Sequence, residues 1–117
     1  MWQDIEFLKQ RVRQLISKYE SLATEQGDVE LLIDDERMRY MALRVGWVGH
    51  KRIHLCLVHI NICDEQVVIQ CNNTEDLLID ELEEIGILRQ QICSGFLPPE
   101  MRALVEEREA QSELEAV

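Results

Sequence analysis

The side chains best suited to chemistry in this sequence are four cysteines, Cys56, Cys63, Cys71 and Cys93, and the histidines among them. The cysteines form no CxxC pair, which is the usual start of a zinc or redox site. On one strand His59 and Cys63 would share a face but lie about 13 Å apart, too far to bind one ion. We therefore predict no metal and no cofactor, and interpret the cysteines as small, reduced, buried thiols. Cys56 and Cys71 are expected to approach each other across neighbouring strands, where oxidation could join them.

The sequence also predicts no catalytic residue. His59 lies within an apolar run with no nucleophile or carboxylate placed beside it, which is typical of a packing histidine. No serine or cysteine stands on a nucleophile elbow, and no glycine-rich loop is placed to bind phosphate. The acidic clusters at 34–36 and 81–84 lack the spacing of a calcium loop and read as solvated surface. We conclude that the chain is not an enzyme.

The charge balance restricts the partners. The 117 residues contain 12 Lys and Arg against 23 Asp and Glu, which gives a formal net charge of −11. Nucleic-acid affinity depends largely on cations that displace counterions from phosphates, so direct DNA binding is not expected. The longest apolar run, 53–62, is too short and too polar to span a membrane, and no secretion signal is visible. The expected location is the cytoplasm.

The elements that position these residues follow from hydrophobic periodicity and turn chemistry. The predicted helices are 2–23, 75–85 and 100–109, and the predicted strands are 29–33, 38–47, 51–62 and 66–71. Residues 95–99 should run extended, and 110–117 should form a frayed acidic tail. We predict one α+β domain over 1–117, a four-stranded antiparallel meander with an N-terminal helix and C-terminal helices packed on it.

Alternation along the strands predicts the two faces of this sheet. Two-residue turns at Gly49-His50 and Asp64-Glu65 carry the alternation from strand to strand. One face is almost wholly apolar and is expected beneath the helices: Met41, Leu43, Val45, Trp47, Cys56, Val58, Ile60, Ile62, Val67, Ile69 and Cys71. The opposite face is mixed: Leu31, Ile33, Tyr40, Ala42, Leu55, Leu57, His59, Asn61, Val68 and Gln70.

The mixed face is too apolar to be left in water, so we expect the C-terminal segment or another subunit to cover it. A homo-oligomer, most simply a dimer, is predicted. Two aromatic residues beside glycines, one at the end of a strand and one before a proline pair, suit either core packing or an interface. The candidate interface residues are Tyr40, Trp47, Leu55, Leu57, His59 and Phe96.

The run from Gly46 to Arg102 closely resembles the XisI-like proteins, the fdxN element excision controlling factors of cyanobacteria. The shared marks, in order, are Gly46-Trp47 with Gly49, Arg52-Ile53, His59-Ile60 with Ile62, Ile69-Gln70, Thr74-Glu75, Glu81-Leu82, Gly86 and Gly95-Phe96. The sequence departs from the family at Asp64-Glu65, where an Asp-Gly type of turn is usual, and at Leu97, where a histidine often stands. The resemblance covers about residues 3–102.

The resemblance implies a small α+β protein that acts beside a nuclease-like companion, XisH, in programmed DNA excision by a separate recombinase during heterocyst differentiation. Combined with the acidic charge, it leads to the hypothesis of an accessory subunit that engages an XisH-like partner through the mixed face or the acidic surface. The alternative is an antitoxin-like inhibitor that masks a nuclease by mimicking phosphates. A third class, an enzyme or direct DNA-binding factor, is disfavoured by the charge.

Overall fold

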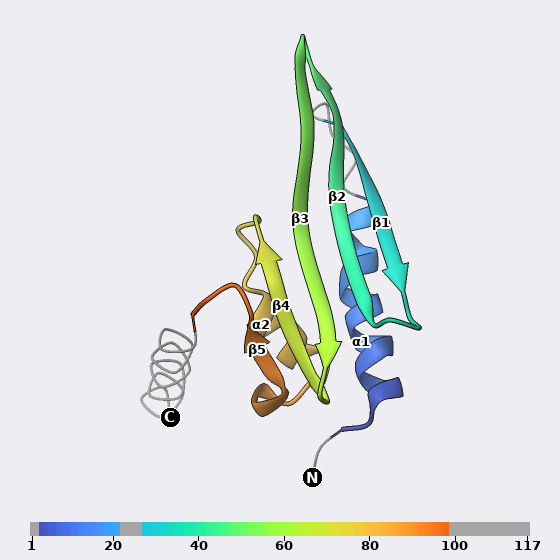
Figure 1. The fold of residues 1–117 in the computed structure, drawn as a ribbon, viewed down its shortest axis with the longest axis vertical. Coiled ribbons are helices and arrows are strands. Elements are labelled where there is room, and N and C mark those ends of the chain that lie inside the picture. Colours follow the sequence, from blue (N-terminus) through green and yellow to red (C-terminus); the bar gives the residue numbers. More distant parts are fainter. Residues whose placement is uncertain (1–2, 22–26, 99–117) are drawn as a thin grey trace.

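The computed structural model describes residues 3–21 and 27–98. The chain forms a five-stranded sheet with two α-helices (Figure 1). The helical segments are α1 Ile5–Ser17, the 3-10 turn η1 Lys18–Ser21, α2 Leu78–Glu84 and the 3-10 turn η2 Arg89–Gln91. The strands are β1 Asp28–Asp34, β2 Arg39–Val48, β3 Lys51–Cys63, β4 Gln66–Asn72 and β5 Ile92–Ser94. Within the described residues, no helix is long and apolar enough to cross a bilayer.

Helix α1 begins where Asp4 caps it and packs through one apolar face. The Asp4 carboxylate accepts a hydrogen bond from the backbone N–H of Phe7 at 2.9 Å, which satisfies a donor that has no partner inside the helix. Its buried side chains recur every three or four residues, so they form one stripe against the sheet: Leu8, Val12, Leu15 and Ile16. The predicted helix is confirmed, although its last turn is the tighter η1.

The four-stranded meander is confirmed, and a fifth strand extends it. The strand order is β1-β2-β3-β4-β5, with antiparallel pairs as far as β4 and β5 parallel to β4. The sequence prediction of a purely antiparallel sheet was therefore incomplete. The buried amide of Gln91 fixes this edge, since its Nε2 donates to the Glu65 carbonyl at 2.9 Å and its Oε1 accepts from the Gln3 N–H at 3.0 Å.

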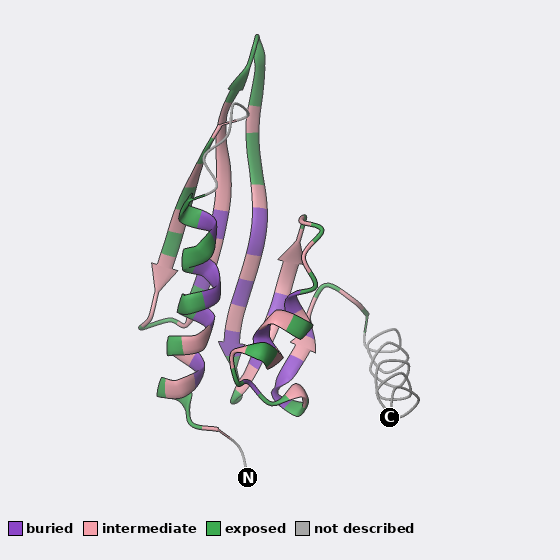
Figure 2. Ribbon diagram, turned by 180° about the vertical axis from the view of Figure 1, so that it is seen from behind, coloured by how far each residue is buried: buried purple, intermediate pink, exposed green. Residues whose placement is uncertain are grey.

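Both helices lie on the same face of the sheet, which is seen from behind in Figure 2. Between them and the strands lies a single apolar cluster, in which the sheet contributes Tyr40, Ala42, Leu57, Val58, Ile60, Ile62, Val67, Ile69 and Ile92. The β2–β3 hairpin extends well beyond the helices, and its tip is exposed (Figure 2). We call the sheet surface that faces the helices the helix face and the other surface the open face.

Two β-bulges overturn part of the predicted face assignment. Between β2 and β3 the register shifts so that Leu43 pairs with Cys56 but Ala42 pairs with Val58, which leaves Leu57 as the extra residue. Because a bulge adds one residue to one strand, alternation across it changes face. Tyr40 and Ala42 therefore lie on the helix face with Ile60, and the predicted assignment of β2 to the helix face through Met41, Leu43, Val45 and Trp47 was wrong.

The second bulge lies in β4 and has the same effect. Ile60 pairs with Ile69 but His59 pairs with Cys71, so Gln70 is the extra residue. Cys71 consequently moves to the open face, whereas the prediction placed it with Ile69. The assignments of Ile60, Ile62, Val67 and Ile69 to the helix face are confirmed because they lie between the two bulges.

Helix α2 begins later than predicted because its polar residues close a loop instead of capping it. The Asn72 side chain accepts from the Thr74 N–H at 3.0 Å and donates to the Asp76 carbonyl at 2.9 Å, so 72–76 is a compact turn. The helix ends as predicted at Gly86, which has a φ of +104°. The Gly86 N–H donates to the Glu83 carbonyl and the Ile87 N–H to the Leu82 carbonyl, each at 3.0 Å, which closes a Schellman motif.

The predicted extended run at 95–99 was wrong at its start, and its last residue lies outside the described residues. Gly95 and Phe96 form a turn after β5, in which the Leu97 N–H donates to the Ser94 carbonyl at 3.2 Å. The predicted helix at 100–109 and the tail at 110–117 lie outside the described residues.

Candidate functional site

The open face carries an apolar column that lies outside the core. Cross-strand partners share a face, so the register places Leu32 of β1 beside Met41 of β2, and Leu43 beside Cys56 of β3. Within the described residues no element covers this surface, which Figure 1 shows in front of the helices. Its apolar members are Leu32, Met41, Leu43, Val45, Trp47, Cys56, Val68, Cys71 and Cys93.

The polar side chains of the open face are arranged by strand. β1 contributes Asp28, Glu30 and Asp34, while β3 contributes Arg52, His54 and His59. The apolar part of β2 runs between these two sets, so acidic and basic flanks lie on opposite sides of an apolar column. Arg39, at the start of β2, pairs with Asp34 in the register.

The candidate interface residues do not form one surface. Tyr40 and Leu57, predicted on the mixed face, are 0% and 6% exposed in the core, so that placement was wrong. The bulge at Leu57 is the reason, because it turns this part of β2 and β3 toward the helices. Leu55 also lies on the helix face, in the part of the hairpin that reaches past the buried core, and is 41% exposed.

Trp47 and His59 lie on the open face. The Trp47 ring is 59% exposed and stacks beneath the Arg52 guanidinium, whose carbon lies 5.3 Å from the ring centroid. His59 is half-buried and belongs to a polar chain. With the Asn61 amide oriented to suit its neighbours, its nitrogen donates to His59 Nε2 at 2.9 Å and its oxygen accepts from Arg39 Nη1 at 3.1 Å. The His59 ring is therefore held by a hydrogen bond from Asn61, as expected for a packing histidine.

Cys56 and Cys71 approach each other, as predicted, but they do so on the open face and not beneath the helices, where the prediction placed both. The Cys71 thiol lies 3.8 Å from the Cys56 carbonyl oxygen, and all four cysteines are free. Burial, and after it the neighbouring Cys71, raises the pKa of the Cys56 thiol to about 11. This thiol is consequently protonated and unreactive at neutral pH. In the part of the chain that the structure describes, no three His, Cys, Asp or Glu side chains are grouped so as to hold a metal ion.

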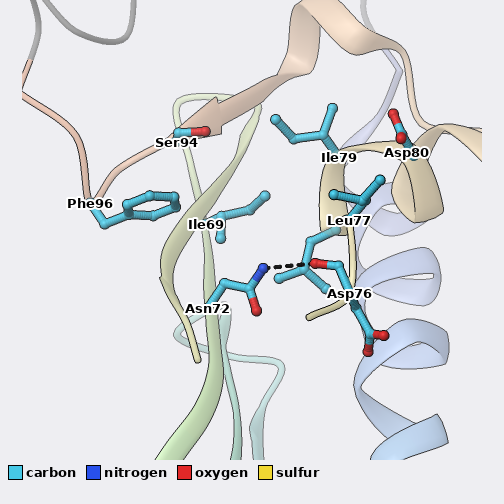
Figure 3. A pocket seen from close by; sticks show the side chains of 9 residues that line it. Ile69, Asn72, Asp76, Leu77, Ile79, Asp80, Ser94 and Phe96 are labelled. Carbon is cyan, nitrogen blue, oxygen red and sulfur yellow. Dashed lines mark hydrogen bonds between the residues drawn. The ribbon is translucent and has the colours of Figure 1, made fainter. Parts of the chain in front are cut away.

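Phe96 lines a pocket between α2 and β5 that the sequence did not reveal (Figure 3). The cavity has a volume of about 170 Å³, with Ile69 and Ser94 from the sheet and Leu77 to Asp80 from the start of α2 in its wall. Leu77 and Phe96 are 70% and 53% exposed, so the mouth is apolar. Asp76 and Asp80 add carboxylates to the lining. The sequence did contain a signal for an exposed apolar site here, the run Leu77-Leu78-Ile79. A short amphipathic helix cannot bury three consecutive apolar residues on one face.

Acidic side chains concentrate around α2, on the helix side of the molecule. This seven-residue helix contains four acids: Asp80, Glu81, Glu83 and Glu84. Two are paired in the structure, since Glu81 binds Lys18 and Glu83 lies 2.7 Å from Arg89. Asp80 and Glu84 are exposed to solvent. The pocket mouth is thus apolar and lies within an acidic surface.

The profile of the family described as XisI protein matches residues 3–107. The chain belongs to the XisI family. No curated protein matches.

Two solved XisI structures from Anabaena variabilis share this fold. A XisI-like protein is 30% identical, with a TM-score of 0.80 over 86% of this chain and 94% of that one. The fdxN element excision controlling factor XisI is 27% identical, with a TM-score of 0.74 over 86% of this chain and 93% of the relative. The family resemblance stated from the sequence is therefore confirmed, and both relatives share the fold of this chain.

Proposed function

We propose that this XisI-family chain is a non-enzymatic accessory factor for programmed excision of a DNA element, and that it acts by binding an XisH-like partner protein. Family membership supports the process, because a solved relative is named an fdxN element excision controlling factor. The observation that carries the mode of action is the apolar pocket mouth within an acidic surface. An accessory factor with a net charge of −11 is suited to a basic, DNA-handling protein rather than to DNA itself.

The pocket supplies the anchor for such a partner. Interfaces derive most of their affinity from a few apolar side chains that fill pockets, with charges around them that guide association. Leu77 and Phe96 offer the apolar contact, and Asp80 offers a carboxylate beside it. The fitting partner segment therefore presents an apolar side chain flanked by lysine or arginine.

Co-purification of this chain with the XisH-like product of a neighbouring gene tests the proposal. The two proteins should elute together at low salt and separate as salt is raised, because the charges at the rim are screened. Leu77→Lys should weaken the complex by about tenfold or more, since it places a cation where the basic partner binds. Leu88→Lys, at an exposed leucine outside the pocket lining, is the matched control and should not. Separate elution of the wild-type proteins at low salt would show the proposal to be wrong.

The net charge favours one other candidate, an antitoxin-like inhibitor of the partner. An acidic surface can occupy the DNA-binding site of a nuclease because it presents carboxylates where phosphates would lie. A nuclease assay of the companion separates the two functions. An accessory factor leaves the companion's activity unchanged or raises it, whereas an inhibitor suppresses it in proportion to the amount added.

A further inference from the structure

The open face is an uncovered apolar sheet surface on a chain whose net charge should keep copies apart. Sheets that expose one face to water alternate apolar and polar residues, so that the wet face is polar. Here Met41, Leu43, Val45 and Trp47 follow one another along the open face of β2. Contiguous apolar patches of this kind usually mark an interaction surface.

The charges of the open face favour a second copy of the chain. Although the whole molecule is strongly acidic, this face carries both signs, with Asp28 and Glu30 on one flank and Arg52 on the other. Local compensation lets two copies approach through this face despite their net charge. A basic partner would suit the acids of β1 but would meet Arg52 and Arg39 with like charge, whereas a second copy can match both signs.

Symmetry then selects the orientation of the two copies. In a two-fold interface the same surface of each copy must complement itself. An axis across the strands would stack β1 on β1 and oppose their acids. An axis along β2 exchanges the flanks, so β1 of each copy lies over β3 of the other while positions along the strands are kept. Because Asp28, Val45 and His54 share one cross-strand row, Asp28 of one copy then faces His54 of the other.

We infer that this chain forms a homodimer in which the open faces of two copies pack together, with the two-fold axis running along β2. The apolar column of each copy buries that of the other, as in the aligned packing of two sheets. The Asp28 carboxylate of each copy pairs with the His54 imidazole of its partner. Since the pocket lies on the helix side, the dimer leaves it open, and each copy can bind its own XisH-like partner.

The solution mass of the full chain tests the dimer. Sedimentation equilibrium at micromolar concentration should give twice the 13.7 kDa of one chain. Leu43→Glu, at the centre of the apolar column, should weaken association by about 100-fold, because it buries a carboxylate without a partner. Leu88→Glu, at an exposed leucine on another surface, is the matched control and should stay dimeric. A wild-type chain of monomeric mass up to millimolar concentration would overturn the inference.

Charge exchange tests the orientation independently of the apolar column. His54→Asp should weaken the dimer by about tenfold, because it places two carboxylates in contact twice in the symmetric interface. Asp28→Lys should weaken it similarly, because it removes the carboxylate that accepts a hydrogen bond from the His54 imidazole. The double variant Asp28→Lys/His54→Asp should restore wild-type association, because the pair is exchanged and not removed. Glu20→Lys, which makes the same change of charge at an exposed site in η1, should have no effect. Additive weakening in the double variant would overturn the axis along β2.

The same variants separate the dimer from partner binding. The open-face variants should bind the XisH-like protein as wild type does, and Leu77→Lys should remain dimeric. Circular dichroism and thermal unfolding show whether each variant is folded before its mass is interpreted. If open-face variants lose the partner while the wild-type chain is monomeric, the occupant is the partner, and the inferred homodimer is overturned.

Discussion

At the residue scale, folding changes the pKa of two buried phenols, those of Tyr19 and Tyr40. Tyr19 Oη donates to the Asp76 carboxylate at 2.7 Å, and Tyr40 Oη donates to Asp35 at 2.9 Å. Burial, followed by the hydrogen bond to the carboxylate, raises the pKa of each phenol well above its ordinary value of 10.0. The Tyr19 pair also links segments distant in sequence, since it holds the loop before α2 against η1.

The raised pKa values of the two tyrosines predict that the fold loses stability at alkaline pH. A phenol with a higher pKa in the folded chain stabilises the fold fully below pH 10, and this contribution is lost as pH rises above that value. The free energy of unfolding should fall by about 1.4 kcal/mol per pH unit for each tyrosine above about pH 10. Urea titrations between pH 9 and pH 11 measure it.

The chain provides its own control for this prediction. Because it contains only two tyrosines, absorbance near 295 nm reports their titration directly. Tyr19→Phe should remove about half of the alkaline slope and cost about 1–2 kcal/mol at neutral pH, since it deletes a hydrogen bond to a charged acceptor. A stability that is flat above pH 10 would contradict the assignment of both phenols.

The cysteines predict a difference in alkylation rate. The pKa of Cys56, raised to about 11 from its ordinary value of 9.0, lowers its thiolate fraction at pH 8 by about 100-fold. Iodoacetamide should therefore modify the exposed Cys63 long before Cys56, which mass spectrometry of digested samples can follow over time. In urea the two rates should converge. Equal rates in the folded chain would show that Cys56 is not shielded.

At the element scale, the β3–β4 turn holds two residues other than glycine in the left-handed backbone conformation, which is unfavourable for them. Asp64 and Glu65 have φ values of 51° and 62°, so the predicted two-residue turn is of type I′. Glycine is preferred at the second position because other side chains are strained there. The turn nevertheless forms, since the flanking strands and the Gln91 amide on the Glu65 carbonyl hold it.

This strain predicts a stabilising substitution. Glu65→Gly should raise the free energy of unfolding by about 0.5–1 kcal/mol, because relief of left-handed strain exceeds the added entropy of the unfolded chain. Urea denaturation measures the change. Glu36→Gly, in the β1–β2 turn, is the control, since Glu36 does not have a positive φ and should gain nothing. Destabilisation by Glu65→Gly would mean that the side chain of Glu65 contributes more than its backbone costs.

At the scale of the whole molecule, the net charge governs which partners the chain can bind. The isolated chain should show no binding to duplex DNA even at low salt, because its formal net charge of −11 opposes the phosphates. Fluorescence anisotropy with a labelled duplex at about 20 mM salt measures this. Salt-sensitive, sub-micromolar binding by the chain alone would contradict the proposed division of labour, in which the partner contacts DNA.

The two proposed surfaces are arranged so that both can be used together. The pocket opens beside α2 on the helix side, whereas the inferred dimer buries the open face. The sheet therefore separates self-association from partner binding, with the apolar core between them. A dimer of this kind would present two equivalent acidic pockets to an XisH-like protein.

The sequence determined the local structure because short-range signals were strong. Periodicity marked α1, turn residues fixed the order of four strands, and Gly86 with Ile87 ended α2 as predicted. Spacing of the marks from Gly46 to Phe96 also identified the family. The net charge is a property of composition alone.

Tertiary structure decided which face of the sheet is buried. Leu57 and Gln70 are extra residues that reverse the alternation of side chains between the two faces of the sheet. Neither position carries a glycine or proline that would indicate a bulge from the sequence. Tyr40 and Leu57 consequently belong to the core, while Met41 and Leu43 face outward. The short β5 likewise forms only because β4 offers its edge and Gln91 ties it to Glu65. Bulges and edge pairing depend on contacts between segments distant in sequence, which local patterns do not encode.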